Sequence, residues 1–173
     1  MRDKANEQII YLVSGPLGVG KSTTTKELAQ KVKRCVLIEG DDLLHMYKGE
    51  LQPTWEERLD LTWKNILALT RNFIQHDLNV VIDFVVEEEL EWFCNQLSDL
   101  NVTLKYVVLR ADKEVLMERL HTRGDNTHSV QRSMFLLDKL EGYPSNSQFL
   151  LDTTLKHPAK IAEEIINDSS FYI

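Results

Sequence analysis

Short apolar segments of strand type alternate along the chain with longer segments that carry an apolar stripe. The strand-type segments are residues 9–14, 35–39, 79–86, 103–109 and 149–153. Helices are predicted over 21–34, 41–49, 54–77, 87–100, 111–123, 130–142 and 157–168. Strands that are apolar throughout and alternate with helices are typical of a parallel sheet covered on both faces. The pattern therefore predicts an α/β protein with a five-stranded parallel sheet flanked by helices.

The segment after Pro53 shows the clearest helical period. Its apolar positions recur at spacings of three and four, as one face of a helix requires. These positions are Leu59, Trp63, Ile66, Leu67, Thr70, Phe73 and Ile74. Trp55, Trp63 and Trp92 also fall at helical spacings, so we expect all three to pack rather than to bind a ligand.

Length and composition narrow the possible classes of protein. A chain of 173 residues with 43% apolar residues is expected to form one domain, residues 1–173. Its net charge of −7 argues against general binding of nucleic acid, which needs a basic face. Two cysteines, Cys35 and Cys94, do not make a disulfide framework, and a reducing cytoplasm fits them. The sequence shows no signal peptide and no apolar run long enough for a membrane span, so no membrane contact is expected.

The segment GPLGVGKS, residues 15–22, fits the phosphate-binding pattern G-x-x-x-x-G-K-[ST] at every fixed position. It follows a predicted strand and opens a predicted helix, which is the context that this motif requires. Glycines let successive N–H groups turn toward a phosphate, and the helix N-terminus favours negative charge. We expect ATP to be bound by Gly15, Gly18, Val19, Gly20, Lys21, Ser22 and Thr23. In this arrangement Lys21 reaches the β- and γ-phosphates and the Ser22 hydroxyl is a ligand of Mg²⁺.

Four acids lie at the ends of two predicted strands. Glu39 ends the second strand, Asp41 and Asp42 follow it, and Asp83 lies near the end of the third. Phosphoryl transfer needs a group that accepts the proton of the attacking hydroxyl, and Asp41 is the candidate. Glu39 and Asp83 are candidates for supporting the metal ion, although Asp83 could instead cap a helix that begins near Glu87. Asp42 is expected to cap the helix that follows.

The order of these segments resembles the small P-loop kinases of the nucleoside-monophosphate-kinase fold. Within that group the chain is most similar to the gluconate kinases, and shikimate kinases and chloramphenicol phosphotransferases also have an Asp at the place of Asp41. The resemblance rests on Glu39-Gly40-Asp41 with His45, on KGELQPTWEER, on YVVLRADKEVLMERLHTR and on VQRSMFLLDKLEGYP. It implies a three-layer P-loop fold with a small helical lid at approximately 120–140. It also implies transfer of the ATP γ-phosphate to a hydroxyl of a small metabolite, possibly gluconate, with Asp41 binding and deprotonating that hydroxyl.

One segment departs from the gluconate kinases. The third strand runs into DFVVEEE, residues 83–89, where those kinases have a small polar turn that lines the acceptor site. Three glutamates would repel a carboxylate substrate unless they point outward.

Arginines near the predicted lid are candidates for binding phosphate. The strongest candidate is Arg123, followed by Arg119 and then Arg132. Each arginine could instead lie on a solvated helix face and pair with an acid such as Asp125. Arg58 is a candidate for binding an anionic group of the substrate, with a salt bridge to Asp60 or Glu57 as the alternative. His45 could bind a substrate hydroxyl or simply belong to the short helix. Arg110 could also face the site.

Two further functions stay open. The kinase could act on a nucleotide or an antibiotic as acceptor, and a nucleoside-monophosphate kinase would usually show more arginines around the acceptor phosphate than Arg58 alone. Alternatively, the chain could be a nucleotide-binding regulatory NTPase with a protein partner. A GTPase of that kind should carry an N-K-x-D motif, which this sequence lacks.

Overall fold

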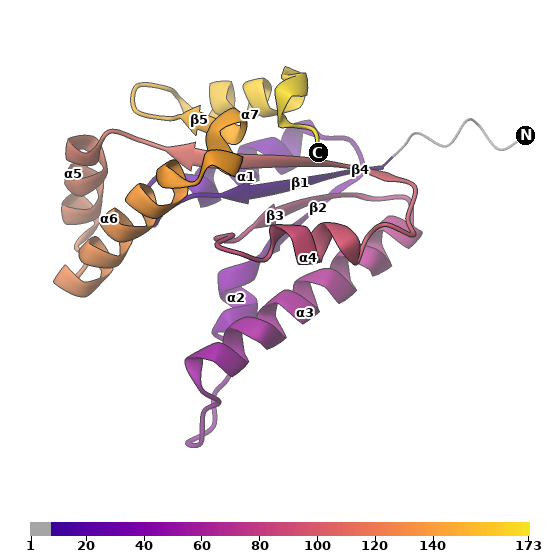
Figure 1. Ribbon diagram of the computed structural model, residues 1–173, viewed down its shortest axis with the longest axis horizontal. Helices are drawn as coiled ribbons and strands as arrows, with labels where there is room; N and C mark the ends of the chain where they lie inside the picture. The colour runs from indigo at the N-terminus through magenta and orange to yellow at the C-terminus, as the bar shows by residue number, and fades with distance from the viewer. Residues whose placement is uncertain (1–7) are drawn as a thin grey trace, which may run out of the picture.

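A computed structural model describes residues 8–173. Its central sheet has the order β2-β3-β1-β4-β5, and every pairing between these strands is parallel (Figure 1). The strands are β1 (Gln8–Ser14), β2 (Cys35–Glu39), β3 (Asn79–Asp83), β4 (Val102–Arg110) and β5 (Leu150–Asp152). This arrangement confirms the predicted five-stranded parallel sheet and the P-loop kinase fold.

Helices cover both faces of this sheet. The α-helices are α1 (Lys21–Lys31), α2 (Gly40–Leu44), α3 (Trp55–Gln75), α4 (Leu90–Asn95), α5 (Lys113–Arg123), α6 (Thr127–Gly142) and α7 (Pro158–Asn167). Two short 3-10 helices, η1 (Pro144–Phe149) and η2 (Ser169–Phe171), complete the chain. Helices α1 and α7 lie on one face, and α3 and α4 lie on the other (Figure 1). Among residues 8–173, no helix is both long and apolar enough to cross a membrane.

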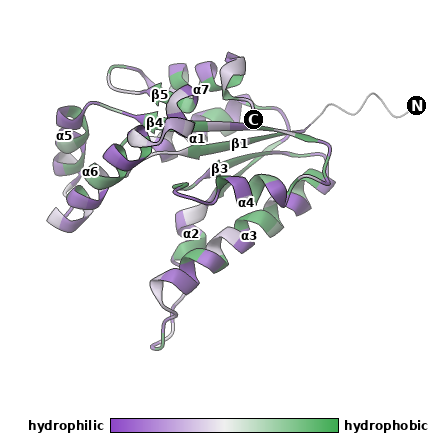
Figure 2. Ribbon diagram, in the orientation of Figure 1, coloured by the Kyte–Doolittle hydropathy of each residue, from purple (hydrophilic) through white to green (hydrophobic). Residues whose placement is uncertain are grey.

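The hydrophobic core fills the two spaces between the sheet and the helix layers. The middle of β1 is almost completely buried, and so are the middles of β3 and β4, because helices cover both of their faces. The apolar sides of the helices turn toward the sheet, while their polar sides face outward (Figure 2). The strands therefore read as continuous apolar runs in the sequence.

Helix α3 begins with a capping box, in which Thr54 and Glu57 bond to each other's backbone N–H groups. Trp63 and Ile66 are buried under this helix, and the Trp63 ring packs edge-on against Phe84 at 5.4 Å between centroids. Trp55, which was also expected to pack, is half exposed at 51%, and its ring centre lies 5.9 Å from the Arg58 guanidinium.

Helices α2 and α4 differ most from their predicted ranges, and both are much shorter. Helix α2 ends at Leu44 rather than at Gly49, and the segment from Met46 to Thr54 has no helical structure. Helix α4 begins at Leu90, because the Glu89 carboxylate folds back and accepts the backbone N–H groups of Glu87 and Glu88.

The prediction that Asp42 caps α2 was also wrong. The first residue outside this helix is Glu39, and no side chain caps the helix there. Asp42 lies in the first turn of α2 and is exposed.

Parallel pairing brings the chemically active ends of β1, β2 and β3 to one edge of the sheet. Asp83 is paired in register with Val13 on one side and with Glu39 on the other. The segment that follows β1 is the glycine-rich loop, and the segment that follows β2 carries Asp41. The acids and the loop are therefore neighbours in space although they are far apart in sequence, as ligand sites in such sheets generally are.

The C-terminal end of α7 is held by a lysine inside the protein. Lys105 of β4 is 1% exposed, and its Nζ donates to the carbonyl oxygens of Ile165, Ile166 and Asp168 at 2.9, 2.7 and 3.0 Å. The ammonium group also lies 4.4 Å from the centre of the Tyr172 ring. Carbonyls at the end of a helix have no partner within the helix, so this one cation satisfies three of them.

We expect Lys105→Met to lower the free energy of unfolding by about 3 kcal/mol, because the shorter, neutral side chain leaves buried carbonyls without donors. Urea denaturation of the variant and of the wild-type protein measures this difference. Lys33→Met, at an exposed position, is the matched control and should change the free energy of unfolding by less than about 0.5 kcal/mol. Equal stability of the two variants would contradict the role given to Lys105.

Candidate active site

The loop between β1 and α1 has the backbone conformation that a phosphate-binding loop needs. Gly18 has φ of +81° and Gly20 has φ of +102°, a region that residues with a Cβ rarely adopt. A Cβ on Gly18 would also lie 2.6 Å from Cδ2 of Leu120 in α5. Gly20 is the residue immediately before α1, so the N–H groups of the first helical turn point out of the helix end.

Lys21 folds back over this loop. Its Nζ donates to the carbonyl oxygens of Gly15 at 2.8 Å and Pro16 at 3.0 Å. Burial lowers the pKa of Lys21, while the nearby carboxylates of Asp83 and Asp41 act in the opposite direction and the Arg123 guanidinium lowers it further. The ammonium group is thus held between the loop and two acids, where an incoming phosphate would meet it.

Asp83 is buried beneath the start of α1. It is 7% exposed, and the Thr25 hydroxyl donates to its Oδ2 at 3.4 Å. Burial raises the pKa of Asp83, whereas Lys21 and the hydroxyls of Ser22 and Thr25 act to lower it. The Asp83 side chain accepts a hydrogen bond from α1 and not from the segment that follows β3. This contact favours the role of supporting a metal over the alternative of a helix cap. The role in supporting the metal itself stays a prediction.

A cavity of about 420 Å³ lies in front of the loop. It brings together Asp41, Arg119 and Arg123, which the sequence singled out, with the glycine-rich loop. Its lining residues are Leu17, Gly18, Val19, Gly20, Lys21, Ser22, Thr23, Thr24, Asp41, Arg119, Arg123, Thr153, Lys156, Pro158 and Ile161. Asp41 is exposed at the first turn of α2.

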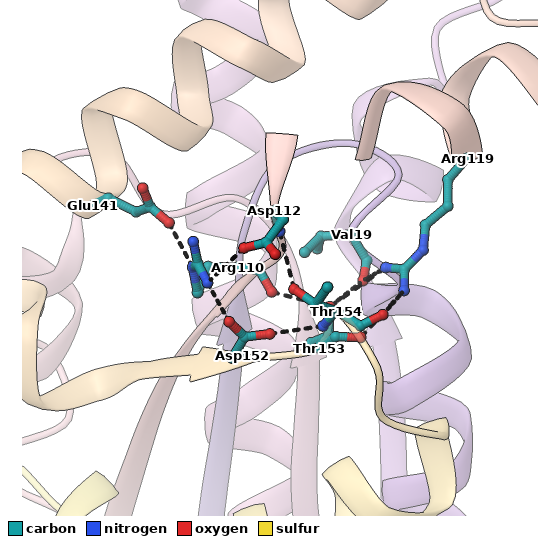
Figure 3. Close-up of polar contacts among 8 residues, drawn as sticks. All are labelled: Val19, Arg110, Asp112, Arg119, Glu141, Asp152, Thr153 and Thr154. Atoms are coloured by element: carbon teal, nitrogen blue, oxygen red, sulfur yellow. Dashed lines mark hydrogen bonds and ion pairs between the residues drawn. The ribbon is translucent and has the colours of Figure 1, made fainter. Parts of the chain in front are cut away.

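Arg119 joins the loop to the segment after β5 (Figure 3). Its guanidinium donates to the carbonyl oxygens of Val19 at 3.3 Å, Thr153 at 3.2 Å and Thr154 at 3.1 Å. The Thr153 hydroxyl in turn donates to the Val19 carbonyl. Among residues 8–173, no carboxylate pairs with Arg119, so its positive charge is available to a phosphate or a nucleobase in the cavity.

The other predicted arginines have carboxylate partners. Arg123 pairs with Asp125 at 2.6 Å, which is the alternative that the sequence left open, yet it still lines the cavity. Arg132 pairs with Glu87 in the segment after β3. The phosphate-binding roles of Arg119, Arg123 and Arg132 stay predictions.

Arg110 is engaged away from the cavity, contrary to the suggestion that it faces the site. Its guanidinium forms ion pairs with Glu141 at 2.6 Å, with Asp112 and with Asp152 (Figure 3). The network fastens the ends of β4 and β5 to α6. Because Asp152 precedes Thr153, this network holds the segment after β5 in place. Arg110 therefore supports the cavity wall without lining the cavity.

The cavity lining leaves out Gly15, Asp83 and Arg132, and three further predicted residues, Glu39, His45 and Arg58. Glu39 forms an ion pair with Lys26 at 3.1 Å, so it is engaged with α1, and its predicted metal role stays untested. The Nδ1 of His45 lies 2.7 Å from the Asp41 carbonyl oxygen, which holds the ring at the end of α2.

Arg58 is the third of these residues. It donates to the Leu44 carbonyl at 2.8 Å and lies near the rings of Tyr47 and Trp55. Within residues 8–173, Arg58 forms no salt bridge to Asp60 or Glu57. Asp60 instead pairs with Lys64, and the Glu57 carboxylate accepts the Thr54 N–H. Its role in binding substrate stays a prediction.

Sequence reasoning missed several residues of the site, and two of them make contacts that hold it together. Thr25 bonds to Asp83, and its position three residues after Ser22, on the same helix face, was the available signal. Ser133 of α6 donates to the Leu17 carbonyl at 2.7 Å and fastens the predicted lid helix to the glycine-rich loop. No pattern in the sequence marks that second contact, because it depends on how α6 crosses the sheet.

We expect Asp83→Asn to stabilise the protein without ligand while weakening its binding of Mg·ATP. A carboxyl with a raised pKa in the folded state binds its proton more tightly there than in the unfolded chain. The free energy of unfolding therefore falls as the pH rises through that raised pKa, and a neutral amide avoids this loss. Urea denaturation should show a more stable variant at about pH 7 and a smaller difference at about pH 4.

Calorimetric titration should show Mg²⁺-dependent ATP affinity lower by about 10-fold or more in the same variant. Asp42→Asn, at an exposed position on α2, is the control and should leave both properties unchanged. Unchanged Mg·ATP affinity in Asp83→Asn would remove Asp83 from the metal site.

Comparison with known proteins agrees with this geometry. The family AAA_33, described as an AAA domain, matches residues 10–139. The "Putative adenylate kinase" of Thermococcus kodakarensis is 30% identical over 167 residues, which cover 92% of this chain and 84% of that protein.

Solved structures of small kinases share the fold. The APS kinase of Mycobacterium tuberculosis superposes with a TM-score of 0.67 at 14% identity, covering 93% of this chain and 96% of that one. A gluconokinase of Sinorhizobium meliloti superposes with a TM-score of 0.59 at 20% identity, covering 94% of this chain and 91% of that one. Together with the phosphate-binding loop and its cavity, the family match and the archaeal relative show that this chain belongs to the AAA_33 family and is a small P-loop kinase.

Proposed function

We propose that this kinase transfers the γ-phosphate of Mg·ATP to a hydroxyl group of a small metabolite, with Asp41 as the proton acceptor. The observation that carries the proposal is the place of Asp41, whose carboxylate lines the same cavity as Lys21 and Ser22. A hydroxyl nucleophile must lose a proton during transfer, and a carboxylate beside the γ-phosphate position can accept it.

The residues of the loop fit the phosphates of ATP. The backbone N–H groups of Gly18 to Ser22 and the Lys21 ammonium neutralise charge on the phosphates, and Arg119 and Arg123 face them across the cavity. The segment at Thr153 and Thr154 presents backbone groups beside Arg119, which suits the base end of the nucleotide.

The residues near Asp83 fit a magnesium ion. Mg²⁺ in kinases takes most of its oxygen ligands from phosphates and water, with one or two from the protein. Ser22 would supply its hydroxyl and Asp83 its carboxylate, and Glu39 could join them only by leaving Lys26. When bound, the ion supplies charge neutralisation for the transferring group.

In the proposed reaction, Asp41 accepts the proton of the acceptor hydroxyl while the γ-phosphate is transferred. The acceptor oxygen forms a bond to the γ-phosphorus, and the bond between that phosphorus and the β–γ bridging oxygen breaks. The hydroxyl proton passes to the Asp41 carboxylate, and ADP leaves with the bridging oxygen. The products are a phosphomonoester and ADP.

Arg58 is the residue of the α2–α3 segment that best suits an anionic group on the acceptor. Among residues 8–173 it has no carboxylate partner, and its Nε is buried without any hydrogen-bond partner. Its guanidinium lies 5.7 Å from the Tyr47 ring centre and 5.9 Å from that of Trp55, which favours a fixed orientation. A sugar acid such as gluconate, with one carboxylate and several hydroxyls, fits these features.

A nucleotide acceptor is the second candidate. The archaeal relative is described as an adenylate kinase, and Arg58 could bind an acceptor phosphate as well as a carboxylate. In that reaction the acceptor is already an anion and needs no base, so Asp41 would be dispensable. The two candidates therefore differ in what they predict for Asp41.

We expect Asp41→Asn to lower kcat by about 10²- to 10⁴-fold, because the amide cannot accept the hydroxyl proton. Its ATP affinity should stay within about 2-fold of wild type, since the loop and Lys21 are unchanged. Transfer of labelled γ-phosphate from Mg·ATP to a panel of sugar acids and polyols, with ATP binding measured in parallel, checks both outcomes. Asp42→Asn is the matched control in the same helical turn and should keep full activity, whereas a fully active Asp41→Asn would exclude Asp41 as the base.

We expect Arg58→Gln to raise the KM for an acidic acceptor by about 10-fold while leaving the KM for ATP unchanged, because one charged contact to the acceptor is lost. Steady-state kinetics with each substrate varied in turn separates the two constants. Arg71→Gln is the control, since Arg71 pairs with Asp99 at the surface far along α3. Equal increases in both KM values would mean that Arg58 supports the fold and does not bind the acceptor.

A further inference from the structure

The peptide unit between Leu17 and Gly18, within the phosphate-binding loop, is held in place by helix α6. The Ser133 hydroxyl of that helix donates to the Leu17 carbonyl oxygen at 2.7 Å, between residues 116 positions apart in the sequence. Ser133 is completely buried and does not line the cavity in front of the loop. The Leu17 carbonyl therefore points toward the buried side of α6.

The orientation of this carbonyl sets the direction of the next N–H group. A trans peptide unit is planar, so the N–H of a residue points opposite to the C=O of the residue before it. No cis peptide bond occurs among residues 8–173, and the Gly18 N–H is therefore aimed away from Ser133. Within the same residues this N–H has no backbone acceptor, and Gly18 lines the cavity. The N–H can thus donate to a phosphate oxygen that enters the cavity.

The glycine makes this orientation easy to lose. Gly18 has φ of +81° and no Cβ, and a glycine populates positive and negative φ about equally. The peptide unit before it can therefore turn over, which would place the Leu17 carbonyl oxygen where the N–H had been. An oxygen with partial negative charge in that position would repel a phosphate. The hydrogen bond from Ser133 opposes the rotation, because turning the unit over breaks that bond.

The peptide unit before Gly20 is restrained in the same way. Gly20 has φ of +102°, and the Val19 carbonyl that precedes it accepts from Arg119 Nη1 and from the Thr153 hydroxyl (Figure 3). Thr153 is 1% exposed, so water competes little for this contact. Both carbonyls are thus bound by side chains from other parts of the fold, which leaves the following N–H groups directed elsewhere.

We propose that Ser133 is a positioning residue for ATP binding, because its hydroxyl holds the Leu17 carbonyl so that the Gly18 N–H donates to a phosphate. The inference rests on the binding of ATP that the proposed function requires, and it is independent of the acceptor. Ser133 acts through the backbone and touches no phosphate itself. Helix α6 thereby contributes to phosphate binding although none of its residues lines the cavity.

The first test compares two ligands with Mg²⁺ present. Ser133→Ala removes the hydroxyl and leaves the loop sequence unchanged. Calorimetry should show its affinity for ATP and for inorganic triphosphate lowered by about 10-fold each, because one hydrogen bond to a charged group is misaligned. The two losses should be equal, since the Gly18 N–H is aimed at phosphate and not at the base. Ser129→Ala, at a partly exposed position one turn earlier in α6, is the matched control and should bind both ligands as wild type does.

The amide signal of Gly18 separates positioning from a general loosening of the fold. In NMR spectra of the ¹⁵N-labelled wild-type protein, the Gly18 amide proton should move downfield when triphosphate binds, because a charged oxygen accepts it. In Ser133→Ala this movement should be much smaller. The movement at Gly20 should persist in the variant, because Arg119 and Thr153 still hold the Val19 carbonyl.

Three results would overturn the proposal. These are equal triphosphate affinity in Ser133→Ala and Ser129→Ala, a loss of affinity confined to ATP, and an unchanged Gly18 movement in a variant that has lost affinity. The wild-type spectrum decides even if Ser133→Ala does not fold, because a Gly18 amide proton that stays in place on binding contradicts the proposed contact. If the wild-type protein binds neither ligand, the phosphate site is wrong and the proposal falls with it. Absence of transfer to any hydroxyl, in contrast, would contradict the proposed function alone.

Discussion

The parallel register of β2, β3 and β1 is the constraint on which the active site depends. Because these strands pair in parallel, everything that follows them emerges at one edge of the sheet. That edge receives the glycine-rich loop from β1, Asp41 from the end of β2 and Asp83 from the end of β3. Shifting one strand by a residue would turn Asp83 from its place beneath α1 to the other face of the sheet. The buried apolar faces of the three strands prevent that shift, so the hydrophobic core fixes the positions of the reacting groups.

Two charged groups that are costly to withdraw from water are also ones that the ligand needs. Asp83 and Lys21 are withdrawn from water. Burial raises the pKa of Asp83 and lowers the pKa of Lys21, so it favours the neutral form of each group. Each partly offsets the cost of the other, and phosphates with a metal ion would complete the compensation. Burying charges in this way lowers the stability of the free protein, which is the usual consequence of holding a binding site ready. The core and Lys105, with its three carbonyl partners, supply stability elsewhere.

Local sequence signals predicted the elements that depend on local physics. The phosphate-binding loop, the bounds of β2 and the end of α5 at Gly124 follow from glycine positions and apolar runs. The sequence did not predict the short α2 or the late start of α4. The start of α4 depends on the Glu89 carboxylate, which folds back and accepts the backbone N–H of Glu87. Ion pairs such as Arg132 with Glu87 join residues 45 positions apart, and only the packing of α6 against the sheet brings them together. The sequence therefore yields candidate site residues and one nearby ion pair, Arg123 with Asp125, but not the partners that lie far away along the chain.

The most direct test of transfer to a hydroxyl group is to identify the atom that receives the γ-phosphate. Phosphorus NMR of a reaction of the wild-type protein with Mg·ATP and a mixture of gluconate, polyols and AMP reports that atom, because phosphomonoesters, diphosphates and free phosphate give distinct signals. We expect a new phosphomonoester in amounts equal to the ADP formed. Conversion of AMP to ADP without any new phosphomonoester, or release of free phosphate alone, would contradict the proposal that Asp41 activates a hydroxyl.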